Sequence, residues 1–161
     1  MEVQFREMKE EDIQQVVTLF KKLESESAEV SFAEILDEAE LCEKMKETGC
    51  FFYVAEDNGQ VVSVFRGKQG EGNKSHSALL TIAVDPNFRG KKMAKTFTQY
   101  CLDQLKNNGI TLARAYVYSN NKPSINTLLS QGFTFSGCVY QHHKNETTGE
   151  FVDDIIFHKI L

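Results

Sequence analysis

The sequence predicts an α/β fold with a mixed sheet, contained in one domain that spans residues 1–161. Runs rich in β-branched and aromatic residues alternate with amphipathic stretches of helical period, in the order β-α-α-β-β-β-α-β-α-β-β. The 161 residues are 41% apolar and include only two prolines, so the chain can bury a core without disulfides or metals.

The first third predicts one short strand and two helices. Residues 3–8 read as a strand. Residues 10–27 have acids at the start and one apolar helical stripe, formed by Ile13, Val16, Val17, Phe20 and Leu23. Residues 32–49 repeat this pattern and end at a glycine, with a stripe formed by Phe32, Ile35, Leu36, Ala39 and Met45.

The middle of the chain predicts three strands. Residues 50–56 and 60–68 are β-rich and are joined by Asp-Asn-Gly, a strong hairpin signal. Residues 77–84 form a nearly continuous apolar strand of the kind that is buried on both faces. Residues 67–75, GKQGEGNKS, resemble a phosphate-binding P-loop, but Asn73 separates glycine from lysine and a strand follows. We therefore expect a flexible hairpin loop there.

The last third predicts two helices and three strands. Residues 91–109 form a helix with an apolar face at Phe97, Cys101 and Leu105, and residues 110–119 form a strand. Residues 122–132 read as a short helix, with a proline near the start and a glycine past the end. Residues 133–143 and 150–161 read as a strand pair linked through residues 144–149.

Charge is distributed unevenly along the chain. The net charge is −5, which argues against nucleic acid as the main partner. Residues 1–56 hold 15 acids and 6 Lys or Arg, for −9, whereas residues 57–161 hold 8 and 12, for +4. This division suits a cationic substrate and an anionic cofactor, although solvated helix faces would produce the same pattern.

The compartment is predicted from cysteine usage and from the first residues. The four cysteines show no CxxC and no paired spacing, which fits reduced thiols in a cytoplasmic protein. The first twenty positions carry several charges, and no apolar run is long enough to span a bilayer. We therefore expect no signal peptide and no membrane partner.

Metal and serine-hydrolase chemistry are not indicated. His142 and His143 are adjacent, and neighbouring residues on a regular strand point to opposite faces. His76 and His158 have no ligand at a recognised spacing, and no GxSxG motif is present. We expect no metal site.

Residues 84–97, VDPNFRGKKMAKTF, are the strongest candidate site. A strand that ends just before a helix brings the free N–H groups of that helix to the edge of the sheet, where an anion is favoured. Gly90 lets the backbone approach a ligand. Four cations surround the turn: Arg89, Lys91, Lys92 and Lys95. A pyrophosphate fits this constellation, although a basic turn on an exposed surface would have the same composition.

A family resemblance makes this interpretation more specific. LLTIAVDPNFRGKKMAKTF, followed by SNNKPSINTLLSQGF, resembles the acetyl-CoA signature and the next motif of the GNAT superfamily of N-acetyltransferases. The resemblance implies a single GNAT-like domain over residues 1–161, with a mixed, mostly antiparallel central sheet flanked by helices. It implies acetyl-CoA as cosubstrate and no metal.

The resemblance also implies which residues hold acetyl-CoA. Residues 89–94 correspond to the loop that holds the pyrophosphate, residues 82–84 to the splayed strand that pairs with pantetheine, and Asn121 to the asparagine near the following helix. The implied set is Ile82, Ala83, Val84, Arg89, Gly90, Lys91, Lys92, Met93, Ala94, Lys95 and Asn121.

Two positions depart from the family pattern. Lys92 stands at the usual middle glycine, and we expect its backbone to be helical so that its N–H still serves the phosphate. Leu128 stands where many members carry a tyrosine that protonates the departing sulfur. A thiol with a pKa of roughly 8.5 leaves tolerably without that acid. Tyr118 or Tyr140 could replace it, although packing roles suit both.

The expected reaction is direct transfer of acetyl from acetyl-CoA to a primary amine. A small cationic metabolite is the first choice of acceptor, and a protein N-terminus or lysine is the second. No spacing identifies the base that deprotonates the amine; the acids considered are Glu24, Glu26, Glu29, Glu34, Asp153 and Asp154.

Other classes of protein remain open at this point. A non-catalytic module that binds acyl-CoA or a protein partner is the alternative that Leu128 supports. An unrelated nucleotide-binding domain ranks last, because no glycine-rich fingerprint follows an early strand. Homodimerisation through sheet edges is a further expectation.

Overall fold

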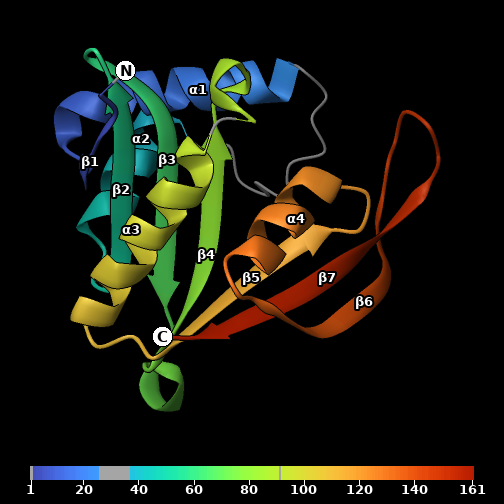
Figure 1. Ribbon diagram of the computed structural model, residues 1–161. Coiled ribbons are helices and arrows are strands. Elements are labelled where there is room, and N and C mark those ends of the chain that lie inside the picture. The colour runs from blue at the N-terminus through green and yellow to red at the C-terminus, as the bar shows by residue number, and fades with distance from the viewer. Residues whose placement is uncertain (1, 26–36, 91) are drawn as a thin grey trace.

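The computed structural model describes residues 2–25, 37–90 and 92–161, and these form one seven-stranded sheet in the order β1-β2-β3-β4-β5-β7-β6 (Figure 1). The strands are β1 (Gln4–Glu7), β2 (Cys50–Asp57), β3 (Gln60–Gln69), β4 (Ser77–Val84), β5 (Leu112–Tyr118), β6 (Thr134–Lys144) and β7 (Phe151–Ile160). β1 and β6 are the two edges of the sheet, where the predicted homodimer contacts would lie; homodimerisation itself stays a prediction.

The sheet is mixed but mostly antiparallel, as expected. Neighbouring strands pair antiparallel throughout, except that β4 and β5 run parallel. A parallel pair needs a crossover connection, and the helix between β4 and β5 supplies it. This parallel junction lies in the middle of the sheet, which is where the candidate site is found.

Helices cover both faces of the sheet. α1 (Ile13–Ser25) and α2 (Glu38–Lys46) lie on one face, and α3 (Met93–Asn107) and α4 (Lys122–Ser130) lie on the other (Figure 1). Among the described helices, none combines the length and the apolar composition that crossing a bilayer requires.

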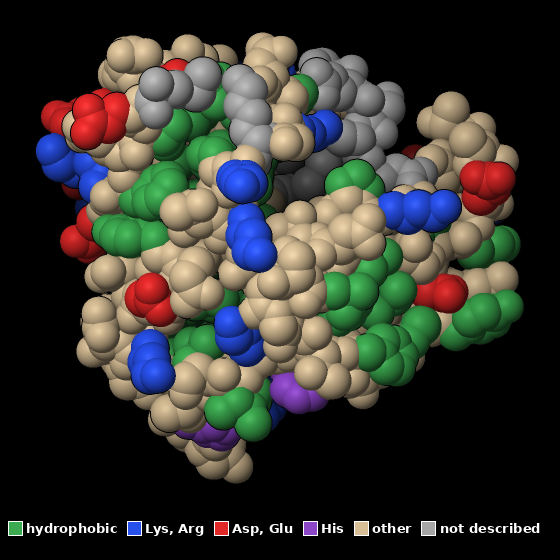
Figure 2. Space-filling model, in the orientation of Figure 1, with side chains coloured by type: hydrophobic (Ala, Val, Ile, Leu, Met, Phe, Trp, Pro, Cys, Tyr) green, Lys and Arg blue, Asp and Glu red, His purple; other side chains and the backbone are tan. Residues whose placement is uncertain are grey.

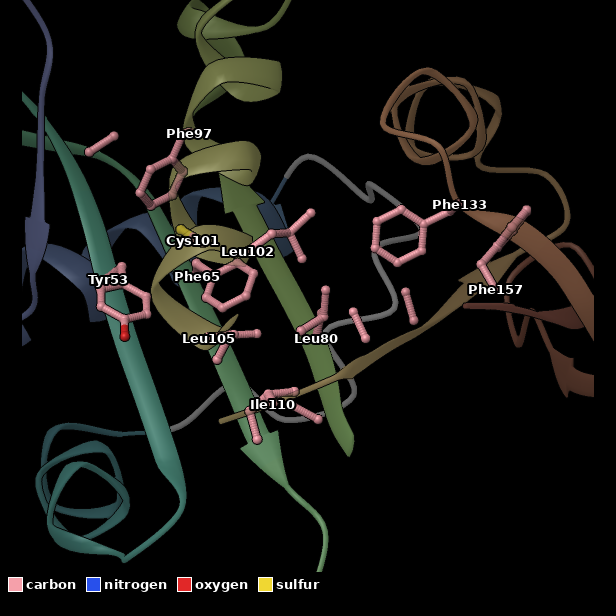
Figure 3. Close-up of a cluster of buried hydrophobic side chains, with 14 of the residues drawn as sticks. Tyr53, Phe65, Leu80, Phe97, Cys101, Leu102, Leu105, Ile110, Phe133 and Phe157 are labelled. Atoms are coloured by element: carbon pink, nitrogen blue, oxygen red, sulfur yellow. The ribbon is translucent and has the colours of Figure 1, made fainter. Parts of the chain in front are cut away.

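Two buried clusters hold these layers together. The cluster under α3 joins the Phe97, Cys101 and Leu105 stripe to the sheet at Tyr53 and Phe65 (Figure 3). The cluster under α1 contains the predicted stripe of that helix and one leucine of α2. The three residues of the α3 stripe are all 0% exposed, so this helix is fixed mainly by apolar burial.

The prediction for the second helix is partly wrong. The expected helix began at residue 32, whereas α2 begins at Glu38, after Asp37 and Glu40 form a capping box. That cap sets the phase of the helix, so Ala39, which we expected on the buried stripe, is exposed, and Leu41 is buried instead. The expected stripe residues Phe32, Ile35 and Leu36 lie outside the described residues.

The two predicted connections between strands are confirmed. Asn58 and Gly59 form the turn between β2 and β3, with φ angles of 50° and 80°. Residues 67–75, the stretch that resembles a P-loop, run from the end of β3 through a short 3₁₀ turn toward β4, and no α-helix follows them before β4.

All four cysteines are free thiols.

Candidate active site

β4 and β5 pair over only part of their length. Their parallel register ends at the pair Leu80 and Ala115, although β4 continues to Val84 and β5 to Tyr118. On their outer sides, β4 stays paired with β3 and β5 with β7 to the ends of both strands. Figure 1 shows β4 and β5 diverging toward the end of β4. Beyond Leu80 and Ala115, the facing edges of β4 and β5 are therefore not paired with each other by backbone hydrogen bonds.

The backbone of β4 directs two amides into this divergence. The N–H of Asp85 donates to the carbonyl of Val62 on β3 at 2.8 Å. Because successive residues of a strand turn their N–H groups to alternate sides, Val84 and Ile82 direct theirs away from β3, toward β5. Ala83 faces β3 and is buried, so of the three strand residues implied as acetyl-CoA ligands, only the other two present backbone groups to the divergence.

The turn after β4 is a short, capped structure. The Asp85 side chain accepts a hydrogen bond from the Asn87 N–H at 2.9 Å and begins a 3₁₀ turn, Pro86–Phe88. Gly90 follows with φ +71°, a conformation that L-residues rarely adopt. Lys92 has φ −55° and ψ −7°, so its backbone is helical, as the sequence predicts. Lys91 lies outside the described residues.

The start of α3 provides the expected set of amides and cations. The first hydrogen bond of the helix runs from the Thr96 N–H to the Lys92 carbonyl, at 3.1 Å. Among the described residues, the preceding amides of Met93, Ala94 and Lys95 therefore have no acceptor in the helix. The Lys92 and Lys95 side chains are exposed, and Figure 2 shows Lys and Arg side chains over the face that carries α3. Free amides together with positive charge favour an anionic group at this turn.

α4 supports that turn from the side. The Asn121 side chain accepts a hydrogen bond from the Ser124 N–H at 3.3 Å and caps α4. Gln131, buried at the end of α4, donates to the Lys95 carbonyl of α3 at 2.8 Å. Leu128 is partly buried and packs against the cluster under α3. The position of the usual tyrosine acid is thus occupied by a packing residue.

The sheet face opposite α3 carries the polar candidates. Ala113, Ala115 and Val117 of β5 are buried in the cluster under α3, so the alternation of the strand turns Tyr118 to the opposite face. Asp154 on β7 is the cross-strand partner of Tyr118. The structure therefore brings these two candidates together.

The remaining predicted candidates are placed apart from that pair. Tyr140 is 76% exposed, which suits a surface role rather than proton transfer in a shielded site. Glu24 is exposed near the end of α1, and Asp153 accepts a hydrogen bond from the Gln141 N–H. Three of the acids considered, Glu26, Glu29 and Glu34, lie outside the described residues.

The expectation that His142 and His143 point to opposite faces is wrong. The register between β6 and β7 shifts after Val139, and Gln141 has φ +50°, so β6 is bulged there. The two imidazole rings lie with centroids 4.7 Å apart, and the His143 ring lies 4.4 Å from the Tyr118 ring. Strict alternation holds for a regular strand, and the bulge interrupts it.

An ion pair that no sequence pattern indicated fixes the base of the turn. Lys22 Nζ on α1 lies 2.9 Å and 2.8 Å from the two carboxylate oxygens of Asp85. Burial alone would raise the pKa of Asp85, but the hydrogen bonds from Lys22 and from the Asn87 N–H lower it below its usual value. The two ion-pair partners are 63 positions apart, so only the tertiary structure joins them.

The sequence of the chain matches one known protein family. The model of the acetyltransferase (GNAT) family matches residues 14–133. A search of curated proteins finds no match to the chain.

Solved structures share the whole fold at low sequence identity. A ribosomal-protein-alanine N-acetyltransferase from Brucella melitensis is 22% identical, with a TM-score of 0.86 over 98% of this chain and 99% of that one. A putative phosphinothricin N-acetyltransferase is 22% identical, with a TM-score of 0.83 over 99% of each chain. A putative acetyltransferase from Salmonella typhimurium, solved with acetyl-CoA, is 18% identical, with a TM-score of 0.86 over 99% of this chain and 94% of that one.

Proposed function

Because the chain belongs to the GNAT acetyltransferase family, we propose that it transfers the acetyl group of acetyl-CoA to a primary amine. The observation that carries this proposal is the divergence of β4 and β5 beside the free amides at the start of α3. One feature offers a strand edge and the other offers an anion seat. A ligand with an extended amide arm and a pyrophosphate can use both features, because the arm pairs with the strand edge and the pyrophosphate binds the free amides.

The residues described above fit acetyl-CoA in a defined order. The pyrophosphate would be held by the turn at Gly90 and the first amides of α3, with Arg89, Lys92 and Lys95 supplying charge. The amide arm would pair with the edge of β4 at Ile82 and Val84. The thioester supplies an activated acyl group at the divergence.

Catalysis in this proposal rests on positioning and electrostatics. The neutral amine attacks the thioester carbonyl carbon, a C–N bond forms, and the C–S bond breaks. A β4 N–H meets the negative charge that develops on the carbonyl oxygen. Tyr118 ends β5, beyond the last pair of β4 with β5, and we propose it as the proton donor to the leaving thiolate. An ordered water accepts the proton lost by the amine.

The acceptor is the finer part of the proposal. The excess of acid in residues 1–56 supports a small cationic amine. Five of those acids already lie in ion pairs, so the support comes from the others. The five are Asp12 and Glu56 with Arg6, Glu11 with Lys9, Glu43 with Lys46 and Glu47 with Lys44. The Brucella neighbour is by name an N-acetyltransferase of a ribosomal-protein alanine, and this supports a protein N-terminus as the second choice.

A binding module without turnover is the second candidate. The observation that favours it is Leu128, which packs against the core and has no proton to donate. Such a module would bind acetyl-CoA and leave the thioester intact.

Release of free CoA thiol over a panel of amines tests the proposal. The panel should hold polyamines, aminoglycosides, amino acids and peptides with an N-terminal alanine. We expect thiol release that depends on an amine and is strongest with cationic acceptors. Binding of acetyl-CoA with no release for any amine would establish the module instead, and a clear preference for anionic amines would overturn the inferred acceptor class.

Two lysines on α3 provide a matched control for the cofactor seat. Lys95 lies in the first turn of α3 and Lys106 in the last, and both side chains are exposed. We expect Lys95→Ala to weaken acetyl-CoA binding several-fold and Lys106→Ala to leave it unchanged. Equal effects of the two variants would show that the cations act only through the overall charge of the protein.

A further inference from the structure

Three side chains with metal-binding atoms meet on β6 and β7, outside the proposed cofactor seat. His142 and His143 are consecutive on β6, and Asp154 lies on β7. One potential ligand atom from each lies within 4.8 Å of the other two. No other group of three such residues is found in the part of the chain that the structure describes.

The bulge of β6 creates this arrangement. Between the pairs Val139–Asp154 and His143–Val152, β6 advances four positions while β7 advances two. The extra residues turn both imidazoles toward the same neighbourhood, where the ring centroids lie 4.7 Å apart. A regular strand would have separated them.

The bulge is anchored to the rest of the sheet. The Asp153 carboxylate accepts a hydrogen bond from the Gln141 N–H at 2.8 Å, at the residue with positive φ. Asp153 is also held by Ser119, the residue after β5. The Ser119 N–H donates to the Asp153 carbonyl at 3.0 Å, and the Asp153 N–H donates to the Ser119 hydroxyl at 3.1 Å. The His143 ring also packs on Tyr118. These contacts hold the backbone of the bulge and the His143 ring in place.

One oxygen of the Asp154 carboxylate, Oδ1, is buried without a hydrogen-bond donor among the described residues. The other oxygen, Oδ2, lies 3.6 Å from His143 Nε2, which is too long for a hydrogen bond. Buried carboxylate oxygens are normally paired, because an unpaired one carries a large desolvation cost. A cation at this position would offset that cost.

We propose that His142, His143 and Asp154 bind one first-row divalent transition metal ion, with zinc as the representative. Two imidazole nitrogens and one carboxylate oxygen are ligands of the type that zinc prefers. Tetrahedral ligands about 2.0–2.2 Å from zinc lie roughly 3.4 Å apart, close to the 3.6 Å between His143 Nε2 and Asp154 Oδ2. The His142 side chain is exposed and can rotate toward the ion. The fourth position is left for water.

Calorimetric titration of the full-length protein with zinc, after treatment with EDTA, tests this proposal. We expect one zinc ion per chain and a rise in melting temperature on binding. His143→Gln and Asp154→Asn should each weaken zinc binding by about 100-fold or more, since even changes to residues that only orient metal ligands cost 10- to 100-fold. His76→Gln, which removes a histidine in the loop before β4, is the matched control and should bind zinc as the parent does.

Two further variants keep the result interpretable. Cys138→Ser removes an exposed thiol on β6, and unchanged zinc binding in this variant excludes a thiolate site. Asp154→Asn removes a carboxylate that has one buried oxygen without a donor in the described part of the chain, so its melting temperature without metal should equal or exceed that of the parent. Absence of saturable zinc binding, or binding that survives both His143→Gln and Asp154→Asn, would overturn the proposal. Because the readout is metal binding rather than acetyl transfer, the test is independent of the proposed function.

Discussion

Lys22 of α1 donates to both carboxylate oxygens of Asp85, at 2.9 Å and 2.8 Å, and so links a helix on one face of the sheet to the residue that follows β4. Asp85 is buried, whereas Lys22 is partly exposed. The residues that follow Asp85 form the proposed pyrophosphate turn. The position of that turn therefore depends on a contact made from the opposite face of the sheet.

Replacing Lys22 tests this dependence. Lys22→Met leaves the buried Asp85 with the hydrogen bond from the Asn87 N–H but without its ion-pair partner, and we expect a loss of about 1–3 kcal/mol in the free energy of unfolding at neutral pH. Urea denaturation measures this loss. Lys21→Met, an exposed neighbour on the same helix, is the control and should lie within about 0.5 kcal/mol of the parent.

The same pair has a defined pH dependence. The folded-state pKa of Asp85 is lowered, so its contribution is complete above the ordinary aspartate pKa of about 3.9 and is lost as the pH falls through the folded-state value. The difference in stability between the parent and Lys22→Met should therefore close in acid. A difference that stays constant as the pH falls from about 4 through the lower folded-state pKa would contradict the assignment.

Gly90→Ala should weaken acetyl-CoA binding about tenfold. A Cβ on Gly90 would meet open space, so the substitution costs conformational energy alone, about 1–2 kcal/mol at φ +71°. Relief of that strain moves the backbone that faces the pyrophosphate. Gly59→Ala is a close match, with φ +80° and open space around the added Cβ, but it lies in the hairpin between β2 and β3. Calorimetry with acetyl-CoA should show weaker binding for Gly90→Ala alone, and equal losses in both variants would mean that general destabilisation is the cause.

Tyr118→Phe should lower kcat with little change in acetyl-CoA affinity. The phenol is the proposed proton donor, and a thiol is a tolerable leaving group without it, so we expect a fall of about 10- to 100-fold. Tyr140→Phe removes an equivalent hydroxyl from a side chain that is 76% exposed, and should leave kcat unchanged. Steady-state kinetics of both variants, with the favoured amine, decide between the two tyrosines. A parent-like kcat for Tyr118→Phe would leave solvent as the proton source.

Gln141→Gly should preserve or increase stability. Gln141 holds φ +50°, which costs a residue with a Cβ about 1 kcal/mol and costs glycine little. Glycine elsewhere in a strand is unfavourable, so Tyr140→Gly at the preceding position should destabilise the protein by about 0.5–1 kcal/mol. Thermal melting compares the two. Destabilisation of similar size in both variants would show that β6 is regular in solution.

Much of the fold follows from local patterns. The strand at residues 77–84 is predicted to the residue and the hairpin at Asn58 and Gly59 to within one residue, because an apolar run and a turn signal are both local. The start of α2 was misplaced because an apolar stripe does not show where a capping box begins the helix. The burial of Leu41 follows from that phase.

Some features of the candidate site follow from local sequence, and others depend on the tertiary structure. The positive φ at Gly90 and the helical backbone of Lys92 agree with what the local sequence allows at each position. The ion pair of Lys22 with Asp85 and the approach of His143 to Asp154 depend on strand register and a bulge, which no local spacing reports. Strand alternation turns the backbone of Ala83 toward β3, and its role as an acetyl-CoA ligand stays a prediction.

Amide exchange measured by NMR, with and without acetyl-CoA, tests the central claim most directly. We predict that the Ile82 and Val84 amides, which face the divergence, exchange more slowly when the ligand is bound, by up to about 100-fold at about 100 times Kd. The Ala83 amide, which faces β3, should change less. Unchanged exchange at Ile82 and Val84 in the presence of saturating acetyl-CoA would contradict the account.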